Sequence, residues 1–175
     1  MTNFMVDIET LGNEPGCVVL SIGAVQFNMA GVYQQFYKRI DIAEAVVIGL
    51  TADPSTIKWW KEQSPQAYAA AFYEGVAHSP YEALSELNIF FAGALPKQVW
   101  TFGNFDLPIL ETVYDMLELP TPWSFRDFRD VRTLLSFSLN ITRRMASIPH
   151  HALDDAVAQA YDVINACKAL GLSLK

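Results

Sequence analysis

The sequence predicts an α/β domain in which strands and helices form layers, and three observations support this fold class. Three strand-like segments follow one another between residues 3 and 40. Helical spacing of apolar residues replaces strand-like patterning after residue 54, and one more strand followed by a helix comes after residue 97. Strands first and helices after, with a later strand-helix unit, are typical of layered α/β or α+β domains.

The first three strands are expected close together in the chain. Residues 3–9 alternate, with apolar side chains at the even positions and Asp7 and Glu9 on the other face. Residues 18–27 and 32–40 are rich in β-branched and aromatic side chains, which favour strands. Sequential strands joined this closely predict an antiparallel meander.

The helices that follow are predicted from proline, capping residues and apolar spacing. Helical spacing covers residues 56–63 and 65–73. Ser79-Pro80-Tyr81-Glu82 forms a capping box with proline at the first helical position, and this helix is expected to reach about Leu95-Pro96.

The second half of the chain is expected to add one strand and two helices. Residues 98–102 predict a fourth strand, and a helix follows it from about Asp106 through Leu117. The last helix is expected to begin near His151 and to stop at Gly171, a favoured residue beyond a helix end.

Length and composition restrict the class of protein. The 175 residues, 51% hydrophobic and 18% charged, predict one globular domain over residues 1–175 rather than a disordered chain. A net charge of −7 argues mildly against strong non-specific DNA binding. Two cysteines are too few for a disulfide framework, and neither a signal peptide nor a membrane-spanning stretch is evident, so a cytoplasmic protein is expected.

Positive charge is concentrated in one short stretch. Five of the six arginines lie between residues 126 and 144. This stretch is either a solvated face or a local phosphate-binding edge on an otherwise acidic protein.

Several acidic residues stand where an isolated charge is costly. Asp7 and Glu9 share one strand face, where like charges disfavour burial unless something positive sits between them, although an exposed edge strand would also account for them. Asp106 follows the fourth strand at its carboxyl end, where α/β sheets bind ligands, but it is also a credible helix N-cap. Asp155 falls at the border of the apolar face of the last helix.

In combination these residues resemble a known family. Asp7-x-Glu9, then Phe105-Asp106, then His150 with Asp155 five residues later, resemble the three motifs of the DEDDh (DnaQ-like) 3′-to-5′ exonucleases. The stretches Asp7-Ile-Glu-Thr-Leu-Gly, Ser21-Ile-Gly-Ala-Val and Thr56-Ile-Lys-Trp-Trp-Lys-Glu-Gln further resemble a subgroup that includes phage exonuclease A and a mycobacterial 3′ exoribonuclease. The resemblance implies a ribonuclease H-like fold with a central mixed five-stranded sheet, an antiparallel meander plus parallel strands, flanked by helices.

The resemblance also implies the chemistry. Asp7, Glu9, Asp106 and Asp155 would hold two divalent ions, Mg²⁺ or Mn²⁺, which prefer oxygen ligands and can stabilise both the attacking and the departing oxygen of a phosphodiester displacement. His150 would be the general base. The expected reaction is 3′-5′ hydrolysis of single-stranded DNA or RNA ends to nucleoside 5′-monophosphates, with the arginines guiding the backbone and a homodimer plausible.

His151 competes with His150 for the role of base. On one continuous helix His151 and Asp155 share a face, whereas His150 and Asp155 differ by about 140°. Pro149 removes this conflict if His150 lies in the loop before the helix, and the family spacing fits only His150.

Three residues are expected to contact the substrate, namely Leu11, Asn104 and Phe105. Leu11 matches a family position that presses on terminal bases but could equally be a core leucine, and Phe105 could also be core. Trp59 and Trp60 cannot both face inward on one helix, so one of them is expected to be exposed or at an interface.

Three other functions compete with the exonuclease. A nucleic-acid-binding module of the same fold would lack catalysis, although every expected ligand position is occupied here. A serine hydrolase is disfavoured because no Gly-x-Ser-x-Gly turn is present. An internally cutting nuclease of the same fold would be distinguished by cleavage of circular substrates.

Overall fold

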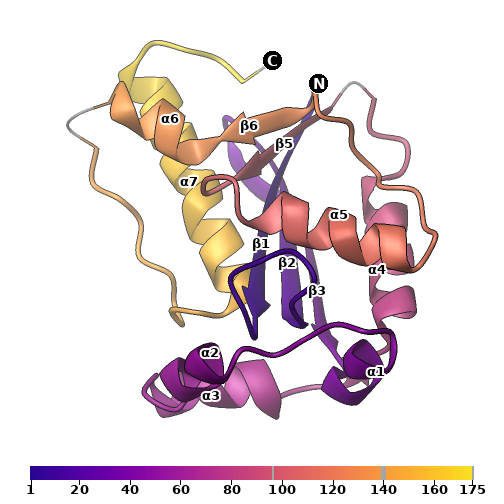
Figure 1. Cartoon of the computed structure of the whole chain (residues 1–175). Coiled ribbons are helices and arrows are strands. Elements are labelled where there is room, and N and C mark those ends of the chain that lie inside the picture. The colour runs from indigo at the N-terminus through magenta and orange to yellow at the C-terminus, as the bar shows by residue number, and fades with distance from the viewer. Residues whose placement is uncertain (96, 139–140, 175) are drawn as a thin grey trace.

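The computed structural model describes residues 1–95, 97–138 and 141–174. It contains one mixed sheet of six strands in the order β4-β3-β2-β1-β5-β6, which places β1 near the centre (Figure 1). The strands are β1 (Thr2–Thr10), β2 (Val19–Asn28), β3 (Gly31–Ile40), β4 (Ala77–His78), β5 (Lys97–Thr101) and β6 (Phe128–Asp130). The predicted antiparallel meander of β1, β2 and β3 is confirmed, while β5 pairs in parallel with β1 and β6 in parallel with β5.

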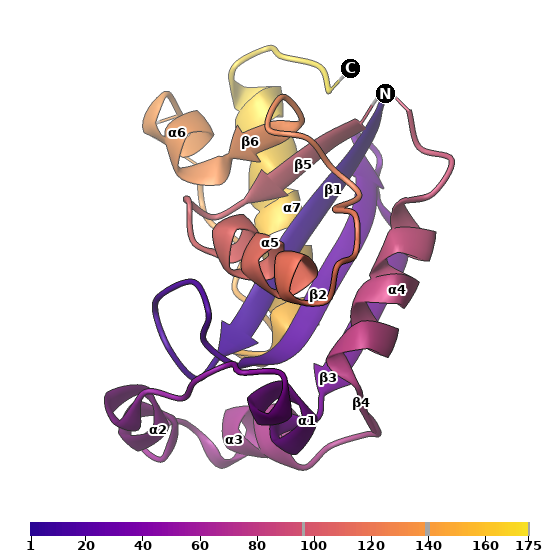
Figure 2. The ribbon, with the colours of Figure 1, turned by 45° about the vertical axis from the view of Figure 1, so that its right-hand side comes forward.

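Helices cover both faces of this sheet. Figures 1 and 2 show α7 on one face, α4 and α5 on the other, and α1 to α3 gathered at one end. The helices are α1 (Ile42–Val47), α2 (Pro54–Trp60), α3 (Pro65–Phe72), α4 (Pro80–Phe91), α5 (Asp106–Met116), α6 (Val131–Ser136) and α7 (Ala152–Ala169). None of the helices in the described part of the chain has the length and apolar character needed to cross a membrane.

The sequence predicted the long elements better than the short ones. The capping box of Ser79 and Glu82 is present at the start of α4. This helix ends at Phe91, earlier than predicted, because Ala92 is extended and Gly93 takes a positive φ of 75°; the predicted endpoint at Pro96 lies outside the described residues. The sheet has six strands rather than five, and α1, α6, β4 and β6 were not predicted, since two to six residues carry too little periodicity.

The alternation along β1 divides the interior into two cores. Phe4, Val6 and Ile8 pack into the core beneath α4 and α5. Met5 packs with α7 residues such as Val163 in the second core. Asp7 and Glu9 share the Met5 face. They therefore lie on the side that α7 covers, rather than on an exposed edge.

A glycine on β2 allows α7 to approach the sheet. Gly23 pairs with Asp7 of β1. A Cβ at this position would lie 2.2 Å from the carbonyl carbon of Ala152 and 2.4 Å from the nitrogen of Leu153. Any side chain at Gly23 would therefore collide with the backbone of the first turn of α7. That turn carries Asp155, so the close approach brings Asp155 towards the carboxylates of β1.

The variant Gly23→Ala tests this contact. The added methyl meets backbone atoms that cannot rotate away, so α7 must shift, and we expect a loss of at least about 2 kcal/mol in the free energy of unfolding. Urea denaturation measures this loss. An unfolding midpoint equal to that of the wild type would show that the first turn of α7 is not packed against β2.

Candidate active site

The four predicted carboxylates and the predicted base line one cavity. Asp7 and Glu9 come from β1, Asp106 from the first residue of α5 and Asp155 from the first turn of α7, with His150 in the turn before α7. All five border a cavity of about 380 Å³. Glu9 and Asp106 are buried, and the other three are partly buried. Four separate segments of the chain thus converge on one site.

Two hydrogen bonds connect carboxylates of the site to neighbouring elements, one between α5 and β1 and one between α7 and β1. The backbone N–H of Ile8 donates to Oδ1 of Asp106 at 3.1 Å, which ties the start of α5 to the strand that carries Asp7 and Glu9. Asp106 is therefore not the helix N-cap, because its side chain reaches across to β1. The amide Nε2 of Gln159 donates to Oδ1 of Asp7 at 2.7 Å and links α7 to the same strand.

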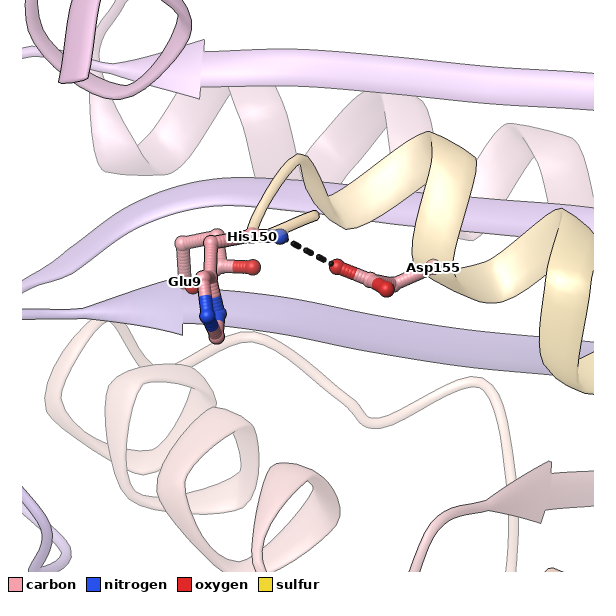
Figure 3. Close-up of side chains that lie close together, drawn as sticks. All are labelled: Glu9, His150 and Asp155. Carbon is pink, nitrogen blue, oxygen red and sulfur yellow. Dashed lines mark hydrogen bonds between the residues drawn. The ribbon is translucent and has the colours of Figure 1, made fainter. Parts of the chain in front are cut away.

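His150 lies outside the continuous helix, as its spacing to Asp155 requires. Its φ of 62° is in the left-handed region, and its backbone N–H donates to Oδ2 of Asp155 at 2.8 Å (Figure 3). Its ring lies edge-on to Trp59, with centroids 4.9 Å apart. This turn brings the imidazole back over the site and removes the angular conflict of a continuous helix.

His151 has a different surrounding. It is the N-cap of α7, where Nδ1 accepts a hydrogen bond from the backbone N–H of Asp154 at 3.4 Å. Its ring packs against Tyr37, with centroids 4.5 Å apart. His151 is not among the residues that line the carboxylate cavity.

The carboxylates destabilise one another in their charged forms. Burial first, and then the negative charges of Asp106, Glu9 and Asp155, raise the pKa of Asp7 well above its ordinary value. Burial and the charges of Asp155 and Asp106 do the same to the pKa of Glu9. Burial raises the pKa of Asp106 to about 7, although the N–H of Ile8 and the charge of Arg132 oppose the shift.

The residues present fit divalent cations. The site offers carboxylate oxygens, which hard cations such as Mg²⁺ and Mn²⁺ prefer, and a cation would offset the repulsion among them. The side-chain amide of Gln159 that donates to Asp7 also carries the oxygen Oε1. This oxygen is buried and accepts no hydrogen bond within the described chain, so it is a further oxygen without a partner. Single ligand atoms of Glu9, His150 and Asp155 also lie within 4.8 Å of one another.

A second cavity adjoins the first. It measures about 460 Å³ and shares Ile8, Glu9 and Phe105 with the carboxylate cavity. Its wall on α2 contains Trp59, whose side chain is 38% exposed. The remaining lining residues are mainly polar, namely Thr10, Asn13, Ser55 and Thr56, together with Trp60.

The three residues predicted to contact the substrate lie in different places in the structure. Phe105 lines both cavities. Leu11 is buried in the core and lines neither of them. Asn104 borders a different cavity, beside Trp123.

The tryptophan pair divides as its helical spacing requires. Trp60 is 1% exposed and donates from Nε1 to the carbonyl of Thr10 at 2.8 Å, whereas Trp59 faces the second cavity. Sequence reasoning thus predicted that only one ring would be exposed, and the structure shows that it is Trp59.

Four residues that line the carboxylate cavity were not among the predicted site residues, namely Ile8, Phe102, Arg132 and Gln159. Gln159 could have been found, because it lies four residues after Asp155 on the same face of an otherwise apolar helix. Arg132 was predicted only as one of five arginines that could bind phosphate, and its place at the cavity could not be predicted because it belongs to the short helix α6, which was not predicted.

Comparisons with known proteins agree with this geometry. Residues 2–166 match the 3′-5′ exoribonuclease Rv2179c-like domain family. The chain is 26% identical over 196 residues to an exodeoxyribonuclease of Enterobacteria phage T4, covering 95% of this chain and 85% of that protein.

Solved structures show the same fold at low sequence identity. The nuclease domain of 3′hExo, a DEDDh family member bound to rAMP, superposes with a TM-score of 0.64 at 14% identity, covering 99% of this chain and 94% of that one. Escherichia coli Exonuclease I in complex with an oligonucleotide gives the same TM-score and identity, covering 95% of this chain. The chain spans only 40% of the length of Exonuclease I. The family match covers nearly the whole chain, and the protein belongs to the Rv2179c-like 3′-5′ exoribonuclease domain family.

Proposed function

We propose that this protein is a metal-dependent 3′-5′ exonuclease that hydrolyses single-stranded nucleic acid from its 3′ end and releases nucleoside 5′-monophosphates. The observation that carries the proposal is the convergence of Asp7, Glu9, Asp106, Asp155 and His150 on one cavity. Residues 1–175 would form a single exonuclease domain. Family membership supports the reaction, and the geometry supports the roles of the residues.

Asp7, Glu9, Asp106 and Asp155 would hold two divalent ions, Mg²⁺ or Mn²⁺. When bound, the ions supply positive charge at the scissile phosphate and lower the pKa of water. The hydrogen bonds from Ile8 and Gln159 hold Asp106 and Asp7 in place as ligands.

His150 acts as the general base and accepts a proton from the attacking water. Its backbone hydrogen bond to Asp155 and its edge contact with Trp59 fix the ring at the cavity. Removal of a positioned general base typically costs about 10²–10⁴ in rate.

The second cavity receives the terminal nucleoside. A volume of about 460 Å³ lies within the ordinary range for small-ligand pockets. Trp59 offers an exposed ring on which a base stacks, and Phe105 lies between this cavity and the carboxylates.

The sugar preference is left to experiment, since the family is named for exoribonucleases and the phage relative is named an exodeoxyribonuclease. The predicted homodimer is also left to experiment. A catalytically silent binding module is the alternative function. Against it, all four carboxylates and the histidine are present and line one cavity.

The first experiment is a time course on DNA and RNA strands of one sequence, labelled at either end. With Mn²⁺ or Mg²⁺ we expect the 3′ label to be released as a mononucleotide at once and the 5′-labelled strand to shorten stepwise. Excess chelator should stop both reactions. Binding without cleavage would support the silent module, and cleavage of a circular strand would support an internally cutting nuclease.

The variants His150→Ala and His151→Ala separate the two histidines. We expect His150→Ala to lower kcat at least about 100-fold, because the base is lost. His151→Ala should spare most of the turnover, because His151 caps α7 and packs on Tyr37. The reverse ranking would transfer the role of base to His151.

The raised carboxyl pKa values predict how stability depends on pH in the metal-free protein. The unfolded chain releases these protons near pH 4, whereas the folded protein keeps the proton of Asp106 up to about pH 7. Folding therefore loses stability as the pH rises through this window. We expect the Tm in chelator to fall by about 5 °C or more between pH 5 and pH 8, and added Mn²⁺ to restore it at pH 8.

The matched variant for this measurement is Asp7→Asn, which removes one charge without changing the shape of the side chain. It should raise the Tm in chelator at pH 8 and weaken the stabilisation by Mn²⁺. A wild-type Tm in chelator that rises from pH 5 to pH 8 would contradict the assignment of these groups.

A further inference from the structure

Two arginines from different segments pack on one aromatic ring beside the carboxylate cavity. The guanidinium carbon of Arg132, on α6, lies 5.0 Å from the centroid of Phe102. That of Arg143, in the loop before α7, lies 4.5 Å from the same centroid. Phe102 and Arg132 line the carboxylate cavity. A pair of cations is therefore held at the border of the site.

Arg143 is anchored by a buried partner. Its Nε donates to Oδ2 of Asp162 at 2.9 Å, and Asp162 is fully buried in α7. The other oxygen of Asp162 accepts the backbone N–H of Arg144 at 2.7 Å, so the loop is fixed as well as the side chain.

The anchor leaves most of the guanidinium free. An arginine has five N–H donors, and the ion pair with Asp162 uses only the one on Nε. The terminal amino groups have no hydrogen-bond partner among the described residues, and the side chain of Arg143 is 52% exposed. Arg132 likewise forms no ion pair within the described chain, and its side chain packs along Gly103.

The other arginines of this stretch make contacts away from the carboxylate cavity. Arg129 donates to the carbonyls of Arg126 and Phe128. Arg144 lies over Tyr161. None of these arginines lines the carboxylate cavity. Among the arginines of this stretch, only Arg132 lines the cavity and only Arg143 shares its contact with Phe102.

We propose that Arg132 and Arg143 form a phosphate track that holds the internucleotide phosphates on the 5′ side of the cleaved bond. This inference rests on the proposed function, which places the terminal nucleoside in the cavity of Trp59. The strand then crosses the carboxylates and leaves past Phe102. A guanidinium group presents its N–H donors in one plane, which matches two phosphate oxygens at once, and the contacts with Phe102 restrict the positions of both groups.

The track also explains how an acidic protein holds a polyanion. The chain carries a net charge of −7, so its net charge repels a nucleic acid at long range. Two fixed cations beside the site bind the phosphates locally, in addition to the ions that the carboxylates hold.

The test measures binding of a single-stranded 12-mer in which a methylene replaces the bridging oxygen of the 3′-terminal linkage, so that Mg²⁺ can be present without cleavage. The variants are Arg132→Gln and the pair Arg143→Gln with Asp162→Asn, because Arg143→Gln alone would leave a buried charge unpaired. Lys168→Gln is the control. It removes one positive charge, as Arg132→Gln does, from the last turn of α7, roughly 20 Å along the helix from Asp155, whereas the double variant leaves the net charge unchanged.

We expect each track variant to raise Kd about 3- to 10-fold. The slope of log K against log salt should fall by about 0.7 for each phosphate that the variant no longer binds. The control should stay within about twofold. For a dinucleotide with the same linkage, which has no phosphate farther upstream, the increase in Kd should be smaller than for the 12-mer.

Two results would overturn the track. One is an unchanged Kd and salt slope in both variants, and the other is an increase in Kd that is equal for the dinucleotide and the 12-mer. Either result leaves the proposed function intact if the wild type still releases a 3′ label. A wild type that binds through the arginines but releases no label would refute the nuclease and not the track.

Discussion

The structure depends on bringing four carboxylates together where water is largely excluded. Asp7 and Glu9 lie on the face of β1 that α7 covers, Asp106 is bonded to the backbone of the same strand, and Asp155 arrives on the first turn of α7. Burial raises the pKa values of all four carboxyl groups, and the charges of the neighbouring carboxylates raise those of Asp7 and Glu9 further, so the arrangement opposes folding when all four are charged. The protein tolerates this cost because the same oxygens are suited to divalent cations. The close packing of α7 at Gly23 serves the same end, since it sets the distance between Asp155 and the two carboxylates of β1.

The surroundings of this centre divide into three parts. On one side of the carboxylates, Trp59 lines the cavity that we propose for the terminal nucleoside. On the other side, Arg132 and Arg143 pack on Phe102. The carboxylates and His150 line the cavity in which the proposed function places the scissile linkage. In the proposed arrangement this order would give the substrate a direction, with its last nucleoside enclosed and its upstream phosphates on the arginines. Polarity then follows from shape and charge rather than from the carboxylates, which would serve an internally cutting enzyme equally well.

Much of this could be predicted from sequence because the signals are local. The alternation of β1, the capping box at Ser79 and the helical spacing of α7 predicted their elements, and the family resemblance of the acidic residues predicted which carboxylates meet at one cavity. Other features depend on contacts between distant segments. Nothing near Leu11 shows that it packs inward, and nothing near Arg132 shows that α6 carries it to the cavity. Gln159 is an intermediate case. The sequence shows its four-residue spacing from Asp155, but it does not show the hydrogen bond from Gln159 to Asp7.

The central claim is that the carboxylate cavity binds a pair of divalent cations, and crystallography tests it most directly. Crystals grown with Mn²⁺ and a nucleoside monophosphate would be measured at a wavelength where manganese scatters anomalously. The account predicts two anomalous peaks among Asp7, Glu9, Asp106 and Asp155, roughly 3.5–4 Å apart as in other two-metal sites. An absence of peaks at these residues in crystals that bind the nucleotide, or manganese bound only elsewhere on the chain, would contradict it.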